Sequence, residues 1–499
     1  MLLTGLLFPA PSPAIESRKI EKMIEASQSS GEGEALVREK QDLLNQGKTY
    51  YYRFCVPCHG KEGKGRGEAS LYIFPKPRDL SSGIFKFHST RTNTLPLNED
   101  LFRTIHKGIP GSPMPAWGET LSDEVIGSLV EFIKTFSRRF SMEVPDHKMP
   151  ISLEPPFDEL SVADGKKLYK QLRCGRCHGE EGTKEGKLVG VVKYFGGNPF
   201  FVYDLRRANL YKSGSTGTDI YRTFMTGLDG SPMNAYDYLS NSERWNLIHF
   251  LQSRFFPQKK EPVPGTNKIL SKQIQSLIDV KPDSSIWKGV AAYRVNLSPV
   301  QARKNPISFL TVQSVHNQNK IAFRMQWEDP TPDGALNSIF LDQSAIQFAL
   351  GQENVLEGPF FGMGEKDKPV NIWHWQADAH QKIIRGDEPE SNRSSKAPPQ
   401  KTGLFVNPFN ESPVEEMNSR GFGTLTVQSL EDQQVEGKGQ WEGGRWSVVF
   451  VRELKTSSRW DVSFADKGQA LLAFALWDGD NKDKSANKMV SFWQVLRLQ

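Results

Sequence analysis

The sequence is poor in cysteine and in long apolar runs, and both absences narrow what the protein can be. All four cysteines fall within two C-x-x-C-H motifs, so none remains for a disulfide. No stretch approaches the ~18 consecutive apolar residues of a membrane span, so we expect no transmembrane helix. A formal charge of +5 over 499 residues, without a basic motif, argues against nucleic acid as a partner. P-loop and dinucleotide-binding fingerprints are also missing.

Length and composition indicate a globular chain of several domains. At ~100–200 residues per domain, the length predicts three or so. The apolar content of 37% and the charged content of 24% are those of an ordinary folded protein.

One pattern occurs twice in the first half of the chain. Cys55, Cys58 and His59 form one C-x-x-C-H motif, and Cys174, Cys177 and His178 form the other. A Gly-Ser-Pro-Met sequence ends at Met114 after the first motif and at Met233 after the second, in each case 59 residues beyond the first cysteine. C-x-x-C-H is the attachment signature of a c-type haem. We therefore expect two covalent c haems, with His59 and His178 as proximal ligands and Met114 and Met233 as sixth ligands.

Other interpretations of these residues are weaker. A Cys₄ zinc site has its second pair some 15–20 residues away and leaves the following histidine unexplained. The methionines could be core residues that fill gaps, but the shared context and spacing favour ligands. His88 and His106 are rival ligands in the first copy, whereas no histidine lies between His178 and Met233.

Covalent haem attachment takes place outside the cytoplasm, so the pattern predicts export to the periplasm. Residues 1–14 contain a short apolar run that ends in small residues, but the positive segment of a signal peptide is missing. We interpret residues 1–14 as the remnant of a signal peptide.

Residues 35–257 resemble two fused class I cytochrome c domains. The first is expected at 35–143 and the second at 159–257, both all-α, with a proline-rich linker at 144–158 between them. Each domain should end in an amphipathic helix, which begins near Ser122 in the first and near Ser242 in the second. Arg78 in the first copy, and Arg206 or Arg207 in the second, could pair with haem propionates.

After a second linker at 258–280, the pattern changes to that of strands. Alternating sequences at 309–315 and 321–327 predict a hairpin, and 446–451 and 469–477 predict further strands. We expect an all-β sandwich domain over 281–499, with a flexible surface loop at 381–402.

This last domain is similar to the haem-binding γ subunit of the ethylbenzene dehydrogenase type. The similarity rests on residues 342–348, 358–364 and 369–378, together with Trp477-Asp478-Gly479 and 488–493. The resemblance implies one non-covalent b haem held between a methionine and a lysine, which would be Met363 and Lys488 here. A lysine binds iron only when neutral, so burial must lower its pKa. Lys482 and Lys484 are rival lysines, and His374 is an alternative ligand.

The sequence thus predicts a periplasmic electron-transfer protein with two c haems and one b haem. By resemblance, its partners would be a molybdenum-containing catalytic subunit, an iron–sulfur subunit and a cytochrome or quinol-linked carrier. The resemblance does not choose between nitrate, nitrite, selenate, chlorate or hydrocarbon chemistry. A dihaem peroxidase would need an open iron, which the two methionines argue against. A free-standing dihaem cytochrome with a C-terminal binding module is the other alternative.

Overall fold

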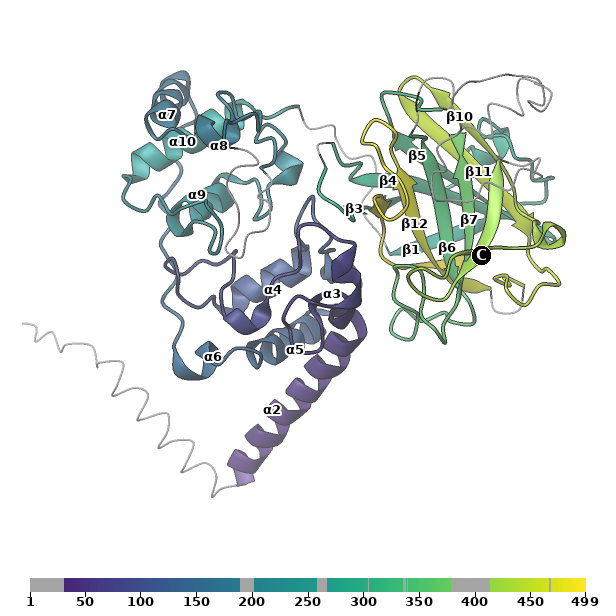
Figure 1. Cartoon of the computed structure of the whole chain (residues 1–499), viewed down its shortest axis with the longest axis horizontal. Coiled ribbons are helices and arrows are strands. Elements are labelled where there is room, and N and C mark those ends of the chain that lie inside the picture. The colour runs from purple at the N-terminus through teal and green to yellow at the C-terminus, as the bar shows by residue number, and fades with distance from the viewer. Residues whose placement is uncertain are drawn as a thin grey trace, which may run out of the picture.

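The computed structural model describes residues 31–188, 202–257, 267–303, 305–334, 338, 340–377, 413–465 and 468–499. Two helical units are followed by one β-rich unit (Figure 1), which confirms the predicted fold class. The predicted signal remnant at 1–14, the loop at 381–402 and part of the linker at 258–280 lie outside the described residues. Within those ranges, no helix is long and apolar enough to cross a bilayer.

The first helical unit contains the first C-x-x-C-H motif. Its elements are α2 (Gly31–Tyr50), η1 (Tyr51–Cys55), α3 (Val56–His59), η2 (Glu68–Leu71), η3 (Leu80–Ser82), α4 (Asn98–Lys107), η4 (Trp117–Glu119), α5 (Asp123–Lys134) and α6 (Arg139–Met142). Ser122 caps α5, because its hydroxyl accepts from the backbone N–H of Val125 at 3.4 Å. Val125, Ile126, Leu129, Val130 and Ile133 are all buried, as the spacing of these apolar residues predicts.

The second helical unit repeats this plan. Its elements are α7 (Glu159–Gln171), α8 (Gly175–His178), η5 (Ala208–Leu210), α9 (Gly217–Thr226) and α10 (Asn241–Ser253). We predicted that the last helix begins near Ser242, and it begins slightly earlier. The cap is Ser240, whose hydroxyl accepts from Glu243 N, while the Glu243 carboxylate accepts from Ser240 N at 2.8 Å.

A glycine lets two long helices of each unit cross closely, α2 with α5 and α7 with α10. A Cβ atom on Gly47 in α2 would lie 2.1 Å from the Ser128 carbonyl oxygen in α5. A Cβ atom on Gly165 in α7 would lie 1.9 Å from the Asn246 carbonyl oxygen in α10. Both distances are impossible for a real side chain, so the two crossings require glycine.

The β-rich unit follows from residue 268. Its strands are β1 (Lys268–Gln273), β2 (Tyr293–Asn296), β3 (Ser298–Pro299), β4 (Phe309–His316), β5 (Lys320–Glu328), β6 (Gln343–Ala349), β7 (Val370–Gln376), β8 (Val414–Ser419), β9 (Thr426–Val427), β10 (Glu436–Glu442), β11 (Arg445–Glu453), β12 (Gln469–Trp477), β13 (Met489–Val490) and β14 (Gln494–Leu498). Two short 3₁₀ helices, η6 (Ser285–Trp287) and η7 (Leu430–Asp432), connect them. The four predicted strands are confirmed as β4, β5, β11 and β12.

These strands form two layers joined through β1. One layer has the order β10-β11-β5-β4-β1 and the other β14-β12-β6-β7-β8-β9. β1 pairs in parallel with β14 and with β4, whereas the other named pairs are antiparallel, so the sheet is mixed. Aromatic side chains from the two layers meet in the core: the ring centroids of Phe323 and Trp373 are 5.9 Å apart, and those of Trp375 and Trp446 are 5.0 Å apart.

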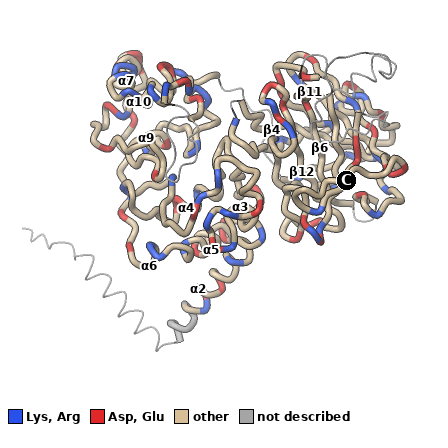
Figure 2. The backbone as a smooth tube through the Cα atoms, viewed as in Figure 1, with Lys and Arg blue, Asp and Glu red and all other residues tan. Residues whose placement is uncertain are grey.

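The second layer is covered on both faces. All seven residues of β6 and all seven of β7 are buried. Side chains on the outer face, including Ala345, Ile372 and Ala473, belong to the same apolar cluster as Leu101 and Ile126 of the first helical unit. The first helical unit therefore packs against the outer face of this layer and lies between the other two units (Figure 1). Lys and Arg are interspersed with Asp and Glu over all three units (Figure 2).

Candidate haem-binding sites

The two C-x-x-C-H motifs are held by the same scaffold. Each motif ends a helix and is followed by a glycine with left-handed backbone, Gly60 with φ 77° and Gly179 with φ 76°. Tyr51 donates its hydroxyl to the Gly60 carbonyl oxygen at 2.8 Å, and Tyr169 donates to the Gly179 carbonyl oxygen at 2.7 Å. A buried tyrosine thus fixes the turn that follows each predicted proximal histidine.

The two methionine loops are built alike. The carbonyl oxygen of Met114 accepts from Ile109 N at 3.0 Å, and that of Met233 accepts from Leu228 N at 2.9 Å. Within each loop the serine hydroxyl accepts from the methionine N–H at 3.3 Å, from Met114 to Ser112 in the first and from Met233 to Ser231 in the second. The repeated Gly-Ser-Pro-Met sequence therefore encodes one loop conformation twice.

Burial keeps the two predicted proximal histidines neutral, which is the form that binds a metal. Burial lowers the pKa of His178 to about 4. Burial also lowers the pKa of His59, although its hydrogen bond opposes the shift. His59 Nδ1 lies 3.1 Å from the Arg78 carbonyl oxygen. Because a carbonyl can only accept, Nδ1 carries the proton and Nε2 is left free as a ligand atom.

The rival histidines of the first unit have other partners. His88 is buried, with Nδ1 at 3.1 Å from the Thr90 carbonyl oxygen and Nε2 at 3.2 Å from an Asp229 carboxylate oxygen. The ring of His106 stacks on Phe102, with centroids 5.7 Å apart.

The arginines predicted to meet propionates differ in their surroundings. Arg206 forms a two-point ion pair with Asp204, at 2.9 and 2.8 Å, so its guanidinium is already engaged. Arg207 lies over the Phe256 ring. The guanidinium of Arg78 lies against Gly230 in the second methionine loop.

The two helical units meet at their methionine loops. Tyr203 of the second unit donates its hydroxyl to the Gly111 carbonyl oxygen in the first loop at 2.5 Å. Asp229 in the second loop accepts from the backbone N–H of Asn93 at 2.8 Å. Each loop is thus held by a residue from the other unit.

A cavity of about 280 Å³ lies on the outer face of the second β layer. Its lining is mostly apolar. Ala345, Ala473 and Ala475 belong to β6 and β12 and lie on this outer face, and their small side chains leave a flat surface. Such a shape suits a flat apolar ligand with few polar groups.

Met363 and Lys488 come together in this cavity. Met363 Sδ and Lys488 Nζ lie 3.9 Å apart, although 125 residues separate them in the chain. Met363 has a left-handed backbone with φ 81°, a conformation that costs free energy in a non-glycine residue and is often retained at functional sites. Burial lowers the pKa of Lys488 to about 8, which makes the neutral amine easier to form than in an exposed lysine.

The two side chains supply donors of a kind that could bind a haem iron. Met363 supplies a thioether sulfur and Lys488 an amine whose pKa is lowered. The cavity and its donors are therefore compatible with a b-type haem.

The alternative ligands occupy different positions. Lys482 and Lys484 are exposed, and Lys484 Nζ lies 5.7 Å from the Phe340 ring centroid. His374 does line the cavity, but its Nε2 lies 2.9 Å from Gln343 Oε1. Burial, with a smaller effect of Lys488, lowers the pKa of His374 to about 3.

The first helical unit supplies part of the cavity wall. Cys58, Tyr72, Pro113 and Pro115 line it beside the residues of the β-rich unit. Cys58 belongs to the first C-x-x-C-H motif, and the two prolines flank Met114. The first c-haem motif therefore adjoins the cavity directly. Sequence patterns could not reveal this, because it depends on how two units dock.

Two further contacts support this junction. Trp117 of the first unit packs edge to face on Phe492 of the β-rich unit, with centroids 4.7 Å apart. Arg53, two residues before Cys55, pairs with Glu365 at 3.0 Å. Glu365 lies two residues after Met363 and also accepts from Phe360 N at 2.7 Å.

Family models match three parts of the chain. The model for ethylbenzene dehydrogenase matches residues 284–489, that for subunit III of cbb3-type cytochrome c oxidase matches 42–133, and that for cytochrome c matches 162–254.

Known proteins show related similarities. A respiratory nitrate reductase heme subunit of Haloferax mediterranei is 28% identical over 220 residues, which are 43% of this chain and 66% of that protein. The chlorate reductase subunit gamma of Ideonella dechloratans is 25% identical over 226 residues, 43% of this chain and 78% of that protein. A solved chain of the reducing HAO-like protein complex of Kuenenia stuttgartiensis is 37% identical, with 42% of this chain and 96% of that chain covered and a TM-score of 0.41.

Proposed function

We propose that this chain, which joins two cytochrome c domains to a domain of the ethylbenzene dehydrogenase family, is the electron-transfer γ subunit of a molybdenum oxidoreductase of the dimethyl sulfoxide reductase family. Similarity to the haem subunit of a nitrate reductase and to the γ subunit of a chlorate reductase supports this role. Such a chain carries electrons for a catalytic subunit and is not itself the catalyst.

Each haem would have its own set of protein ligands. Cys55 and Cys58 would attach the first c haem and Cys174 and Cys177 the second. Their irons would be bound by His59 with Met114 and by His178 with Met233. The b haem would be bound by Met363 and Lys488. When bound, these haems supply one-electron chemistry, and Met/His ligation raises the potential of the c haems.

The proposal depends above all on one observation. Met363 Sδ and Lys488 Nζ lie 3.9 Å apart in a cavity that Cys58 also lines. A b-haem site and a c-haem site that share a wall are expected of an electron relay. A carbohydrate-binding or protein-binding module would not need a half-buried thioether beside a half-buried amine.

The arrangement of the units favours a linear order of the three proposed haem sites. The cavity of the β-rich unit would be followed by the first c-haem site and then by the second, because Cys58 of the first helical unit lines the cavity and the two methionine loops contact each other's units. The second helical unit touches the β-rich unit elsewhere, where Asn209 donates to Ser308 at 3.1 Å. We propose that the cavity end faces an iron–sulfur subunit and that the far c haem meets a cytochrome or quinol-linked carrier. Covalent c haems imply that this exchange takes place in the periplasm.

Haem analysis of the purified full chain tests the proposal. We expect two haems that stay with the protein after extraction with acidified acetone and one that is extracted, with pyridine haemochrome spectra of the c and b types. Cys174→Ala should remove one covalent haem and leave the extractable one. A chain with two covalent haems and no extractable haem would contradict the proposed role of the β-rich unit.

Purification from native membranes and periplasm tests the partners. We expect a molybdenum-containing catalytic chain and an iron–sulfur chain in stoichiometric amounts. If the chain is recovered alone, with rapid peroxide reduction by the reduced protein, a dihaem peroxidase would replace the relay.

A further inference from the structure

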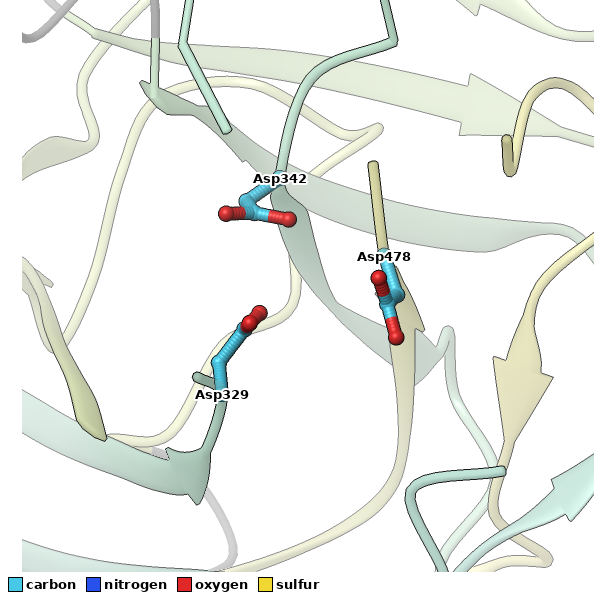
Figure 3. A group of neighbouring side chains, drawn as sticks. All are labelled: Asp329, Asp342 and Asp478. Atoms are coloured by element: carbon cyan, nitrogen blue, oxygen red, sulfur yellow. The ribbon is translucent and has the colours of Figure 1, made fainter. Parts of the chain in front are cut away.

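Three aspartates meet at one end of the β-sandwich. Asp329 follows β5, Asp342 precedes β6 and Asp478 follows β12, so the three come from three different strand ends (Figure 3). One carboxylate oxygen of each lies within 4.8 Å of those of the other two. The side chains are only 2%, 0% and 7% exposed, respectively.

No ion pair within the described residues neutralises these three carboxylates. Arg303, whose charge acts on Asp478, is bound in a buried ion pair with Asp483. Burial, together with repulsion from neighbouring carboxylates, raises the pKa of Asp329 to about 8. A buried charge without a partner is costly, so the arrangement requires either protons or a cation.

Two of the three carboxylates are fixed by hydrogen bonds. The donors to Asp342 are the Trp446 indole N–H at 2.9 Å and the backbone N–H groups of Asp333 at 2.7 Å and Gly479 at 3.0 Å. The donors to Asp478 are the backbone N–H and the side-chain amide of Asn481. Two ligand groups are therefore held in place before anything binds.

Asp329 differs from the other two. Its Oδ1 accepts from Thr331 N at 3.1 Å, but its Oδ2 has no hydrogen-bond partner among the described residues. Its carboxylate points toward the space between Asp342 and Asp478 (Figure 3). A buried carboxylate oxygen without a donor, aimed at two others, indicates a missing ligand.

We propose that Asp329, Asp342 and Asp478 bind one calcium ion. The donors are all carboxylate oxygens, without histidine or cysteine, so the site suits a hard cation. Calcium has oxygen bonds of about 2.3–2.6 Å and tolerates irregular geometry, whereas magnesium needs about 2.0–2.1 Å and a near-ideal octahedron. The three carboxylates come from three separate strand ends and form an irregular donor set, which favours calcium.

The ion would connect the two layers of the sandwich. Asp329 extends from the layer that contains β5, and Asp342 and Asp478 extend from the layer that contains β6 and β12. The site belongs to the β-rich unit alone and does not depend on any haem.

Calcium titration of the full holo-protein tests the site. After treatment with EGTA and dialysis, the wild-type protein is titrated with CaCl₂ and should bind one calcium ion per chain by calorimetry. It should unfold at a higher temperature with the ion bound. Asp329→Asn keeps the shape but removes a charged ligand, so the Kd for calcium should rise at least roughly tenfold. Asp480→Asn is the matched control, since Asp480 is exposed and lies two residues after Asp478, and it should bind calcium like wild type.

Terbium provides a second test that needs no variant. A terbium ion at this site would lie near the indole of Trp446, which donates to Asp342. We expect terbium luminescence on excitation of tryptophan, abolished by excess CaCl₂. No luminescence and no calorimetric signal in wild type would show that the cluster holds protons only and would overturn the proposal. Equal affinity for MgCl₂ would overturn the assignment to calcium.

Discussion

Lys488→Ala is expected to deprive the chain of its extractable haem while both covalent haems remain. Lys488 is the only lysine among the described residues that line the cavity, and its Nζ lies 3.9 Å from Met363 Sδ. Loss of this amine would leave a b-haem iron without one of its two protein ligands. We expect the retained b haem to fall below about one tenth of the wild-type level, a loss of at least about 1.4 kcal/mol in binding free energy. Pyridine haemochrome analysis of extracted haem measures it.

Lys484→Ala is the matched control for this change. Lys484 lies four residues earlier in the same loop but is exposed, so its loss should leave the haem content unchanged. His374→Ala removes the alternative ligand and should keep the b haem bound. If Lys488→Ala retains its b haem and His374→Ala loses it, the lysine is not the ligand.

Trp117→Ala is expected to be the most destabilising change at the junction of the first cytochrome domain with the β-rich unit. Trp117 is 5% exposed and packs between Phe54, at 5.2 Å, and Phe492, at 4.7 Å between ring centroids. Deletion of a buried tryptophan side chain costs about 3–5 kcal/mol. Urea unfolding followed by c-haem absorbance should show this loss in the free energy of unfolding of the first domain.

Two further variants test whether the loss of stability comes from removing a buried, packed ring. Trp117→Phe keeps an aromatic ring between the same neighbours and should recover most of the stability. Tyr238→Ala removes a ring that is 69% exposed and should change stability by less than about 0.5 kcal/mol. A loss below about 1 kcal/mol for Trp117→Ala would mean that the junction is held mainly by other contacts, such as the ion pair of Arg53 with Glu365.

The two cytochrome c units could be predicted because their chemistry is local in sequence. C-x-x-C-H places two thiols and an imidazole on one turn, and Gly-Ser-Pro-Met forms the same hydrogen-bonded loop at both of its positions in this chain. The cap of α5 at Ser122 is equally local. Hydrogen bonds between residues close in sequence leave these segments few other conformations. The sequence pattern was therefore sufficient to predict them.

The cavity between the β-rich unit and the first cytochrome domain could be predicted only in part. Resemblance to a known family pointed to Met363 and Lys488, but nothing in the sequence said that Cys58 shares their cavity. β6 mixes glutamine, serine and alanine with apolar residues, yet all of it is buried. The strand is buried because another domain covers its outer face. Docking of this kind does not produce a regular alternation of apolar and polar residues in the sequence.

The aspartate cluster was missed for a different reason. Asp329, Asp342 and Asp478 are single acidic residues at strand ends, where acidic residues usually face solvent. They become a group only because the fold brings three strand ends together. The position of each beside a strand was visible in the sequence, but their convergence was not.

The wall shared by Cys58, Met363 and Lys488 also implies an order of maturation. Once the first cytochrome domain docks on the sheet, the β-rich unit covers one side of the Cys58 turn. Under the proposed function, thioether formation at that turn would therefore come before docking, while the cysteine is still accessible from both sides. The b haem, which needs both walls, would be enclosed afterwards. The chain would then be loaded in the order in which it leaves the ribosome, from its N-terminal motif to its C-terminal lysine.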